Sequence, residues 1–75
     1  MSSVPGNIIV LRTNINNVSA LSMVAGTLNA HPQIRRWIID LEDKDNVLRI
    51  ESDTLTTKDI ITTLQEAGYE AEDLI

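Results

Sequence analysis

The first third of the chain carries two different spacings of apolar residues. Residues 7–13 (NIIVLRT) are rich in β-branched side chains and stay apolar on both faces until Arg12, which predicts a central strand. From residue 18 onward, the apolar positions recur every three or four residues, as they do on one face of a helix. These positions are Val18, Leu21, Val24, Ala25 and Leu28. The predicted helix ends at NAHP, because a residue before proline disfavours helical backbone angles.

The middle of the chain predicts a hairpin of two strands. Residues 34–42 (IRRWIIDLE) alternate between two faces, as a half-buried strand does. The side chains expected to face the core are Ile34, Trp37, Ile39 and Leu41, and those expected on the opposite face are Arg36, Ile38 and Asp40. Residues 42–46 (EDKDN) form a polar turn. Residues 47–52 (VLRIES) then resume the alternation, with Leu48 and Ile50 on one face.

The last third begins with a helix start signal. Thr56, followed three residues later by Asp59, fits a capping box, in which each side chain bonds a backbone N–H of the other residue. The apolar stripe that follows consists of Ile60, Ile61, Leu64 and Ala67. Gly68 stands where a helix commonly ends. Residues 69–75 (YEAEDLI) are short and charged, which favours a weak edge strand.

The order of these elements is strand, helix, strand, strand, helix, strand. It predicts an α+β protein with the ferredoxin-like βαββαβ fold, in which two helices pack on one face of a four-stranded antiparallel sheet. Right-handed crossovers place the first and third strands in its centre. We expect a single domain over residues 1–75, with residues 1–6 as a flexible lead-in.

Composition narrows the classes of function. The 75 residues include no cysteine, so disulfides, thiolate catalysis and thiolate metal ligands are excluded. A net charge of −5 disfavours nucleic acid and anionic lipid as partners and favours a basic protein. The first residues lack a basic segment, and their apolar run is too short for a signal peptide or a membrane span. We therefore expect a cytoplasmic protein that does not bind membranes.

Four segments of the sequence resemble a known family. They are the helix VSALSMVAGTL, the strands IRRWIIDLE and VLRIESD, and the ending IITTLQEAGYEAE. From Ile8 to Leu74 the chain is similar to the heavy-metal-associated (HMA) domain, which occurs in copper chaperones and in the N-terminal parts of copper-transporting ATPases. The resemblance implies a metal-carrying module whose ligands lie in the loop between the first strand and the first helix.

The same resemblance points to a lost metal site. The family's loop has a T-C-x-x-C motif, and here TNINN occupies it, with Asn14-Ile15-Asn16-Asn17 in place of C-x-x-C. Asn14 and Asn17 thus stand at the positions of the two cysteine ligands. Copper(I) prefers soft thiolates, and a neutral amide oxygen is a hard and weak ligand. We expect no metal and no cofactor.

The loop has two interpretations from its residues alone. Asparagine is a favoured helix N-cap, because its side-chain oxygen accepts a hydrogen bond from a free backbone N–H. In the other interpretation, this helix start binds an anion or a partner's carboxylate. The residues of this candidate interaction site are Arg12, Thr13, Asn14, Asn16, Asn17 and Tyr69. The resemblance places Tyr69 beside the loop, where we expect it to pack over the loop and shield it.

Other candidate groups lie outside the loop. His31 and Met23 are too far from it to build a copper site, because His31 follows the C-terminal end of the helix that the loop begins. The acidic run at residues 40–45 lacks the glycine and the final glutamate of an EF-hand. A negative rim is expected from Glu66, Glu70, Glu72 and Asp73. No nucleophile with a base and no phosphate-binding loop is present, so we do not expect an enzyme.

These observations lead to one hypothesis and one alternative. The hypothesis is an HMA-like domain that has lost its metal-thiolate site and serves as a protein-interaction module. The alternative is a metal chaperone or sensor that uses other ligands, or ligands shared with a partner. The open face of the sheet carries Ile8 and Ile38, which favours a weak homodimer.

Overall fold

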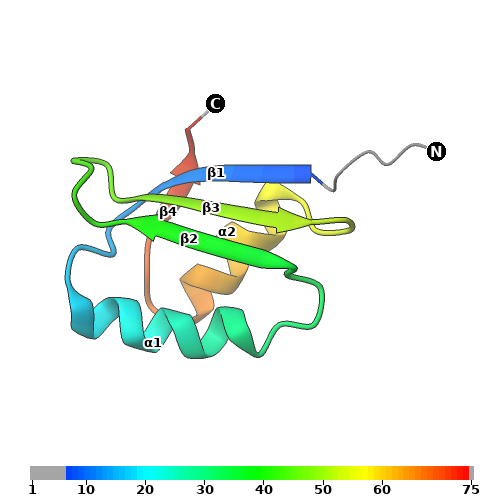
Figure 1. Ribbon diagram of the computed structural model, residues 1–75, viewed down its shortest axis with the longest axis horizontal. Helices are drawn as coiled ribbons and strands as arrows, with labels where there is room; N and C mark the ends of the chain where they lie inside the picture. The colour runs from blue at the N-terminus through cyan, green and yellow to red at the C-terminus, as the bar shows by residue number, and fades with distance from the viewer. Residues whose placement is uncertain (1–6, 75) are drawn as a thin grey trace.

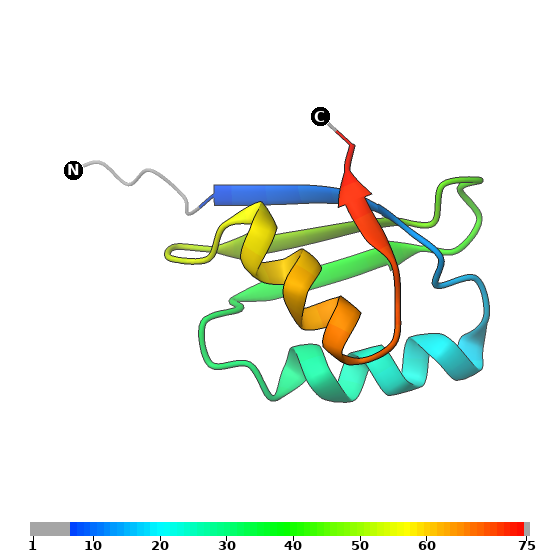
Figure 2. The same cartoon turned by 180° about the vertical axis from the view of Figure 1, so that it is seen from behind.

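The computed structural model describes residues 7–74, and the lead-in expected at residues 1–6 lies outside this part of the chain. The elements, in chain order, are β1 (Asn7–Thr13), α1 (Val18–Asn29), β2 (Arg36–Asp40), β3 (Val47–Ser52), α2 (Thr57–Glu66) and β4 (Ala71–Asp73). Both helices lie on the same face of the sheet, as the two opposite views show (Figure 1, Figure 2). Within the described residues, no helix covers the other face of the sheet.

The sheet has the strand order β2-β3-β1-β4, and all three neighbouring pairs are antiparallel. The first and third strands therefore lie in the centre, and β4 is a short edge strand of three residues. This topology confirms the predicted ferredoxin-like α+β fold. It also brings the end of β1 beside β4, because Thr13 pairs with Ala71.

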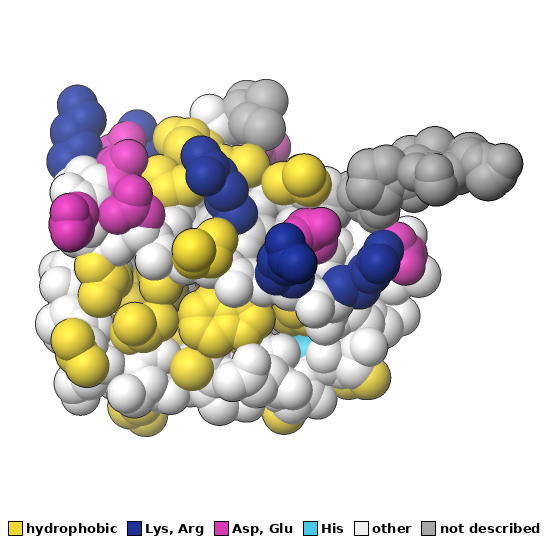
Figure 3. Space-filling model, viewed as in Figure 1, with side chains coloured by type: hydrophobic (Ala, Val, Ile, Leu, Met, Phe, Trp, Pro, Cys, Tyr) yellow, Lys and Arg dark blue, Asp and Glu magenta, His cyan; other side chains and the backbone are white. Residues whose placement is uncertain are grey.

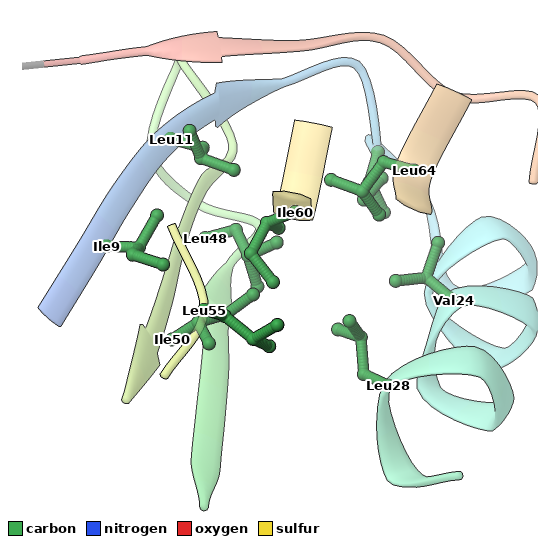
Figure 4. Packing of buried hydrophobic residues seen from close by; sticks show 10 residues of the cluster. Ile9, Leu11, Val24, Leu28, Leu48, Ile50, Leu55, Ile60 and Leu64 are labelled. Carbon is green, nitrogen blue, oxygen red and sulfur yellow. The ribbon is translucent and has the colours of Figure 1, made fainter. Parts of the chain in front are cut away.

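The core lies between the sheet and the two helices. Figure 4 shows side chains from β1 and β3 pointing toward those of α1 and α2. The fully or almost fully buried members are Ile9, Leu11, Ile15, Val24, Leu28, Leu48, Ile50, Leu55, Ile60 and Leu64. Leu48 and Ile50 are both 0% exposed, as the alternation along β3 predicts. Burial of a large aliphatic side chain contributes about 1.5–3 kcal/mol, so these contacts provide most of the driving force for folding.

The second helix starts and ends as predicted. The capping box between Thr56 and Asp59 is present in both directions. Its hydrogen bonds, first from the Thr56 backbone and then from its hydroxyl, hold the pKa of Asp59 below its ordinary value. At the other end, Gly68 has a φ of 93°, a left-handed conformation that glycine adopts without strain.

At the ends of three elements, the structure differs from the prediction: the first apolar position of α1, the last apolar position of α2, and the length of β2. Val18 is 70% exposed, and the neighbouring core position is taken by Ile15, which is 0% exposed. Ala67 is exposed because it is the C-cap of α2 and lies past the buried part of the helix. Strand β2 is shorter than residues 34–42: Ile34 donates its N–H to the His31 oxygen in a turn.

Candidate functional site

Two buried side chains fix the β1–α1 loop (residues 14–17) from the inside. The Thr13 hydroxyl donates to the backbone oxygen of Asn46 at 2.7 Å and accepts from the N–H of Ile15 at 3.2 Å. The side chain of Ile15 is fully buried in the core. The loop is therefore held against the β2–β3 turn, and its asparagine side chains are left on the surface.

Asn14 ties this loop to the start of β4. Its N–H donates to the Glu70 oxygen at 3.2 Å, and its side-chain Oδ1 accepts from the Glu70 N–H at 3.0 Å. The amide side chain thus acts as a substitute backbone carbonyl and extends the β1–β4 ladder by one residue. The Asn14 side chain therefore serves the structure of the loop.

Asn17 is the N-cap of α1. Its backbone is extended, and its Oδ1 accepts from the Ala20 N–H at 2.8 Å. Its amide nitrogen donates to Oδ1 of Asn16 at 3.1 Å. The capping interpretation of the loop is therefore confirmed for Asn17. The side-chain oxygen of Asn17, like that of Asn14, is thus used within the chain.

Arg12 lies at the end of β1 between two carboxylates. Its Nη1 lies 3.0 Å from Oε1 of Glu72, and its Nε lies 3.4 Å from Oδ1 of Asp45. The arginine side chain is 50% exposed, so these ion pairs contribute little to stability. A shallow hollow of about 300 Å³ opens here, lined by Arg12, Thr13, Asn14, Glu70, Ala71 and Glu72.

The structure divides the predicted site into two groups. Arg12, Thr13 and Asn14 line the hollow beside β4, whereas Asn16 and Asn17 are outside its lining and lead into α1. Tyr69 is half-buried and packs against the hydrophobic core. Because the side chains of all three asparagines remain exposed, Tyr69 does not shield them as expected.

Residues 7–74 contain no cluster of three metal-ligating side chains. His31 lies in the turn after α1, where its Nδ1 accepts from the Gln33 N–H at 3.3 Å, and Met23 is exposed on α1. The acids at residues 40–45 cap their own turn: Asp40 accepts from the Glu42 N–H, and Asp43 accepts from the Asp45 N–H. The acids expected to form a rim, Glu66, Glu70, Glu72 and Asp73, are all exposed.

Comparison with known proteins places this geometry in context. The sequence matches no protein-family model and no curated protein sequence. Among solved structures, it is similar to the copper(I)-loaded first domain of the human copper chaperone for SOD1, with a TM-score of 0.77 and 15% identity over 89% of this chain and 90% of that one. The chain has the fold of an HMA domain.

Two further structures share the HMA fold. One is the apo form of the HMA domain of a copper chaperone for superoxide dismutase, with a TM-score of 0.72 and 17% identity over 97% of this chain and 74% of that one. The other is a protein studied for crosstalk between Cu(I) and Zn(II) homeostasis, with a TM-score of 0.78 and 15% identity over 92% of this chain and all (100%) of that one. Unlike a thiolate-ligating HMA domain, this chain has no cysteine. Neither helix within residues 7–74 is long and apolar enough to cross a membrane.

The sequence does not predict which residues of the chain contact Asn14 and Arg12. Glu70 is 56 residues from Asn14, and Asp45 reaches Arg12 from the β2–β3 turn. No local spacing signals either contact, because both depend on the antiparallel neighbours of β1. The burial of Ile15 was also missed, since a lone apolar residue between asparagines has no periodic pattern.

Proposed function

We propose that this HMA-fold chain is a non-enzymatic protein-interaction module that has lost its metal-thiolate site. The observation that carries the proposal is the use of the two ligand positions. Asn14 holds the loop to β4, and Asn17 caps α1, each through its side-chain oxygen. Both positions have a structural role in which the oxygen accepts a strong backbone hydrogen bond, which a thiol does only weakly.

The donor chemistry supports the same conclusion. A neutral amide oxygen is a hard and weak ligand for copper(I), which is held by soft sulfur ligands. The only histidine of the chain follows the C-terminal end of α1, and Met23 lies exposed in the middle of this helix, away from its N-terminal end. We therefore propose that the loop acts through hydrogen bonds and charge, with no resident metal.

The candidate contact surface consists of Arg12, Thr13, Asn14, Asn16, Asn17 and Tyr69, together with the acids beside them. Glu70 and Glu72 line the hollow at the end of β1, and Asp45 lies within reach of Arg12. The chain as a whole has a net charge of −5. A negative surface accelerates encounter with positive partners, so we propose a basic protein as the partner, with neither nucleic acid nor membrane.

A competition titration with a copper(I) chelator tests the loss of the metal site. The purified protein is expected to withdraw no stoichiometric copper(I) or zinc from the chelator. Sub-micromolar binding by the wild-type protein would overturn the proposal.

The partner side of the proposal needs a matched pair of variants. Glu70→Gln removes a charge from the hollow but keeps the backbone bonds to Asn14. Asp53→Asn removes an equal charge after β3, away from the loop. Binding of a basic partner, measured by calorimetry after its isolation, should weaken for Glu70→Gln and stay unchanged for Asp53→Asn. Equal effects of the two variants would mean that only net charge matters.

The second candidate function is a metal site completed by a partner. One observation favours it: the side chains of Asn14, Asn16 and Asn17 are exposed, so a partner's cysteines can approach the loop. Metal that binds only when both proteins are present would support this function. Metal binding by the partner alone with equal affinity would exclude it.

A further inference from the structure

The two edges of the sheet differ in how open they are to another strand. On one edge, β4 has only three residues, two of which are acidic, and this protects it from pairing. On the other edge, β2 pairs with β3 over all five of its residues, and within residues 7–74 no strand is hydrogen-bonded to its outer side. Strand β2 has no proline, lysine or bulge within it, and its centre is Trp37-Ile38-Ile39.

Apolar surface surrounds this open edge. Ile38 is 63% exposed, and a hollow of about 450 Å³ beside β2 is lined by the apolar side chains of Leu21, Ile38, Ile39, Leu41 and Val47, with polar residues around them. Figure 3 shows hydrophobic side chains gathered over β2 and continuing toward the N-terminal half of α1. An apolar edge strand of this kind is the template that a second strand needs.

The open face of the sheet is a poorer contact surface than this edge. In the register of the sheet, Arg49 lies between Val10 and Ile38 on this face. Arg36 and Glu51 form an ion pair in the next row, with Nε and Oε2 3.5 Å apart. Stacking two such faces would bury these charges, so Ile8 and Ile38 do not make the face a good dimer surface. Pairing along the edge leaves the charges in solvent.

The sequence of β2 is complementary to itself in one register. When two copies pair antiparallel with Ile38 opposite Ile38, Arg36 of each copy faces Asp40 of the other. On the helix side, Trp37 then faces Ile39. Parallel pairing would set arginine against arginine, and a slip by two residues would set Ile38 against Asp40. Opposite charges in cross-strand pairs stabilise and like charges destabilise, so the charge pattern selects the Ile38-centred register.

We propose that a second copy of this chain occupies the β2 edge, in an antiparallel β2–β2 pair centred on Ile38. The two sheets become one continuous sheet, and the helices of both copies lie on the same side of it. The arrangement is isologous, since each residue contact occurs twice across a two-fold axis. Strands β2 and β4 are the two opposite edges of the sheet, so this interface lies across the sheet from the hollow that Arg12, Asn14 and Glu70 line.

Charge reversals test both the pairing and its register. Arg36→Asp sets aspartate against Asp40 of the other copy, and Asp40→Arg sets arginine against Arg36. Each single variant should weaken self-association by roughly tenfold or more, because two exposed charge pairs become repulsive at once. The double variant restores both pairs and should associate like wild type. Lys58→Glu on α2, which contacts β1 and β4, is the control that should change nothing.

Mixing the two single variants gives the sharpest measurement. An Arg36→Asp chain and an Asp40→Arg chain carry opposite charges along β2, so together they should form a heterodimer at concentrations at which each alone is monomeric. Sedimentation velocity over a wide concentration range reports the rise from the monomer mass of 8.3 kDa, and circular dichroism verifies that each variant is folded. A wild-type protein that remains monomeric at the highest concentration overturns the proposal. Folded single variants that do not combine overturn it as well.

Discussion

Introducing cysteines into the loop tests whether Asn14 and Asn17 stand at the positions of the two metal ligands. The double variant Asn14→Cys/Asn17→Cys is expected to bind copper(I) or zinc, because it places two soft thiolates at the spacing of the HMA motif. The start of α1 also lowers the pKa of a thiol at position 17, which favours the thiolate that binds metal. The wild-type protein provides the baseline without metal binding.

The same substitutions should destabilise the metal-free protein. Loss of the Asn14 hydrogen bond to the Glu70 N–H, which is 3.0 Å long, costs about 0.5–1.5 kcal/mol. Loss of the Asn17 cap costs about 0.5–2 kcal/mol. The two residues share one loop, so the costs are not strictly additive, and we expect a total of about 1–3 kcal/mol. Each kcal/mol lowers Tm by about 4–8 °C in a domain of this size.

Bound metal should reverse this loss. Free metal at a hundred times its Kd stabilises the folded state by about 2.7 kcal/mol, which is comparable to the cost of the substitutions. Thermal melts with and without metal therefore complement the chelator competition. Asn14→Ser/Asn17→Ser, in which oxygen replaces sulfur, is the control and should show no metal-dependent rise in Tm. A folded cysteine variant that competes for no metal would refute the assignment of the two ligand positions.

Three further predictions concern stability. Ile15→Ala should lower the free energy of unfolding, measured in urea, by about 2–5 kcal/mol because it leaves a cavity at a fully buried position. Asn16→Ala next to it should change this free energy by no more than about 0.5 kcal/mol. Equal effects would contradict the anchoring of the loop through Ile15. Gly68→Ala should lower the free energy of unfolding by about 1–2 kcal/mol, because φ at this position is 93°. Gly26→Ala, with nothing near its added methyl group, should stabilise α1 by about 0.5–1 kcal/mol and raise Tm. A stabilising Gly68→Ala would contradict the left-handed conformation at the end of α2. Because the pKa of Asp59 is lowered in the folded protein, the ionised side chain stabilises the fold fully above the ordinary carboxyl pKa, and this stabilisation is lost as the pH falls through the lowered pKa. The difference in unfolding free energy between wild type and Asp59→Asn should therefore narrow on acidification. A difference that does not change with pH in urea titrations would argue against this role.

The interiors of the elements could be predicted from the sequence because their signals are local. The range of β1, the capping box of α2, the glycine at its end and the alternation of Leu48 with Ile50 all depend on neighbours within a few residues. The order of the elements then restricts the topology to a few choices, among which the right-handed crossovers select the observed sheet. For these features, local propensity and hydrophobic pattern agree with the fold.

Only the tertiary structure determines which residues hold the β1–α1 loop in place. The sequence indicated that an asparagine caps α1, but only the pairing of β1 with β4 gives Asn14 its partner 56 residues away. Tertiary packing also explains why Ile15 is buried in the core and Val18 is exposed. The direction of the chain at the end of an element depends on what packs beneath it. Periodicity identifies the face of a helix along its middle turns, and it carries no information about contacts between strands that are distant in the sequence.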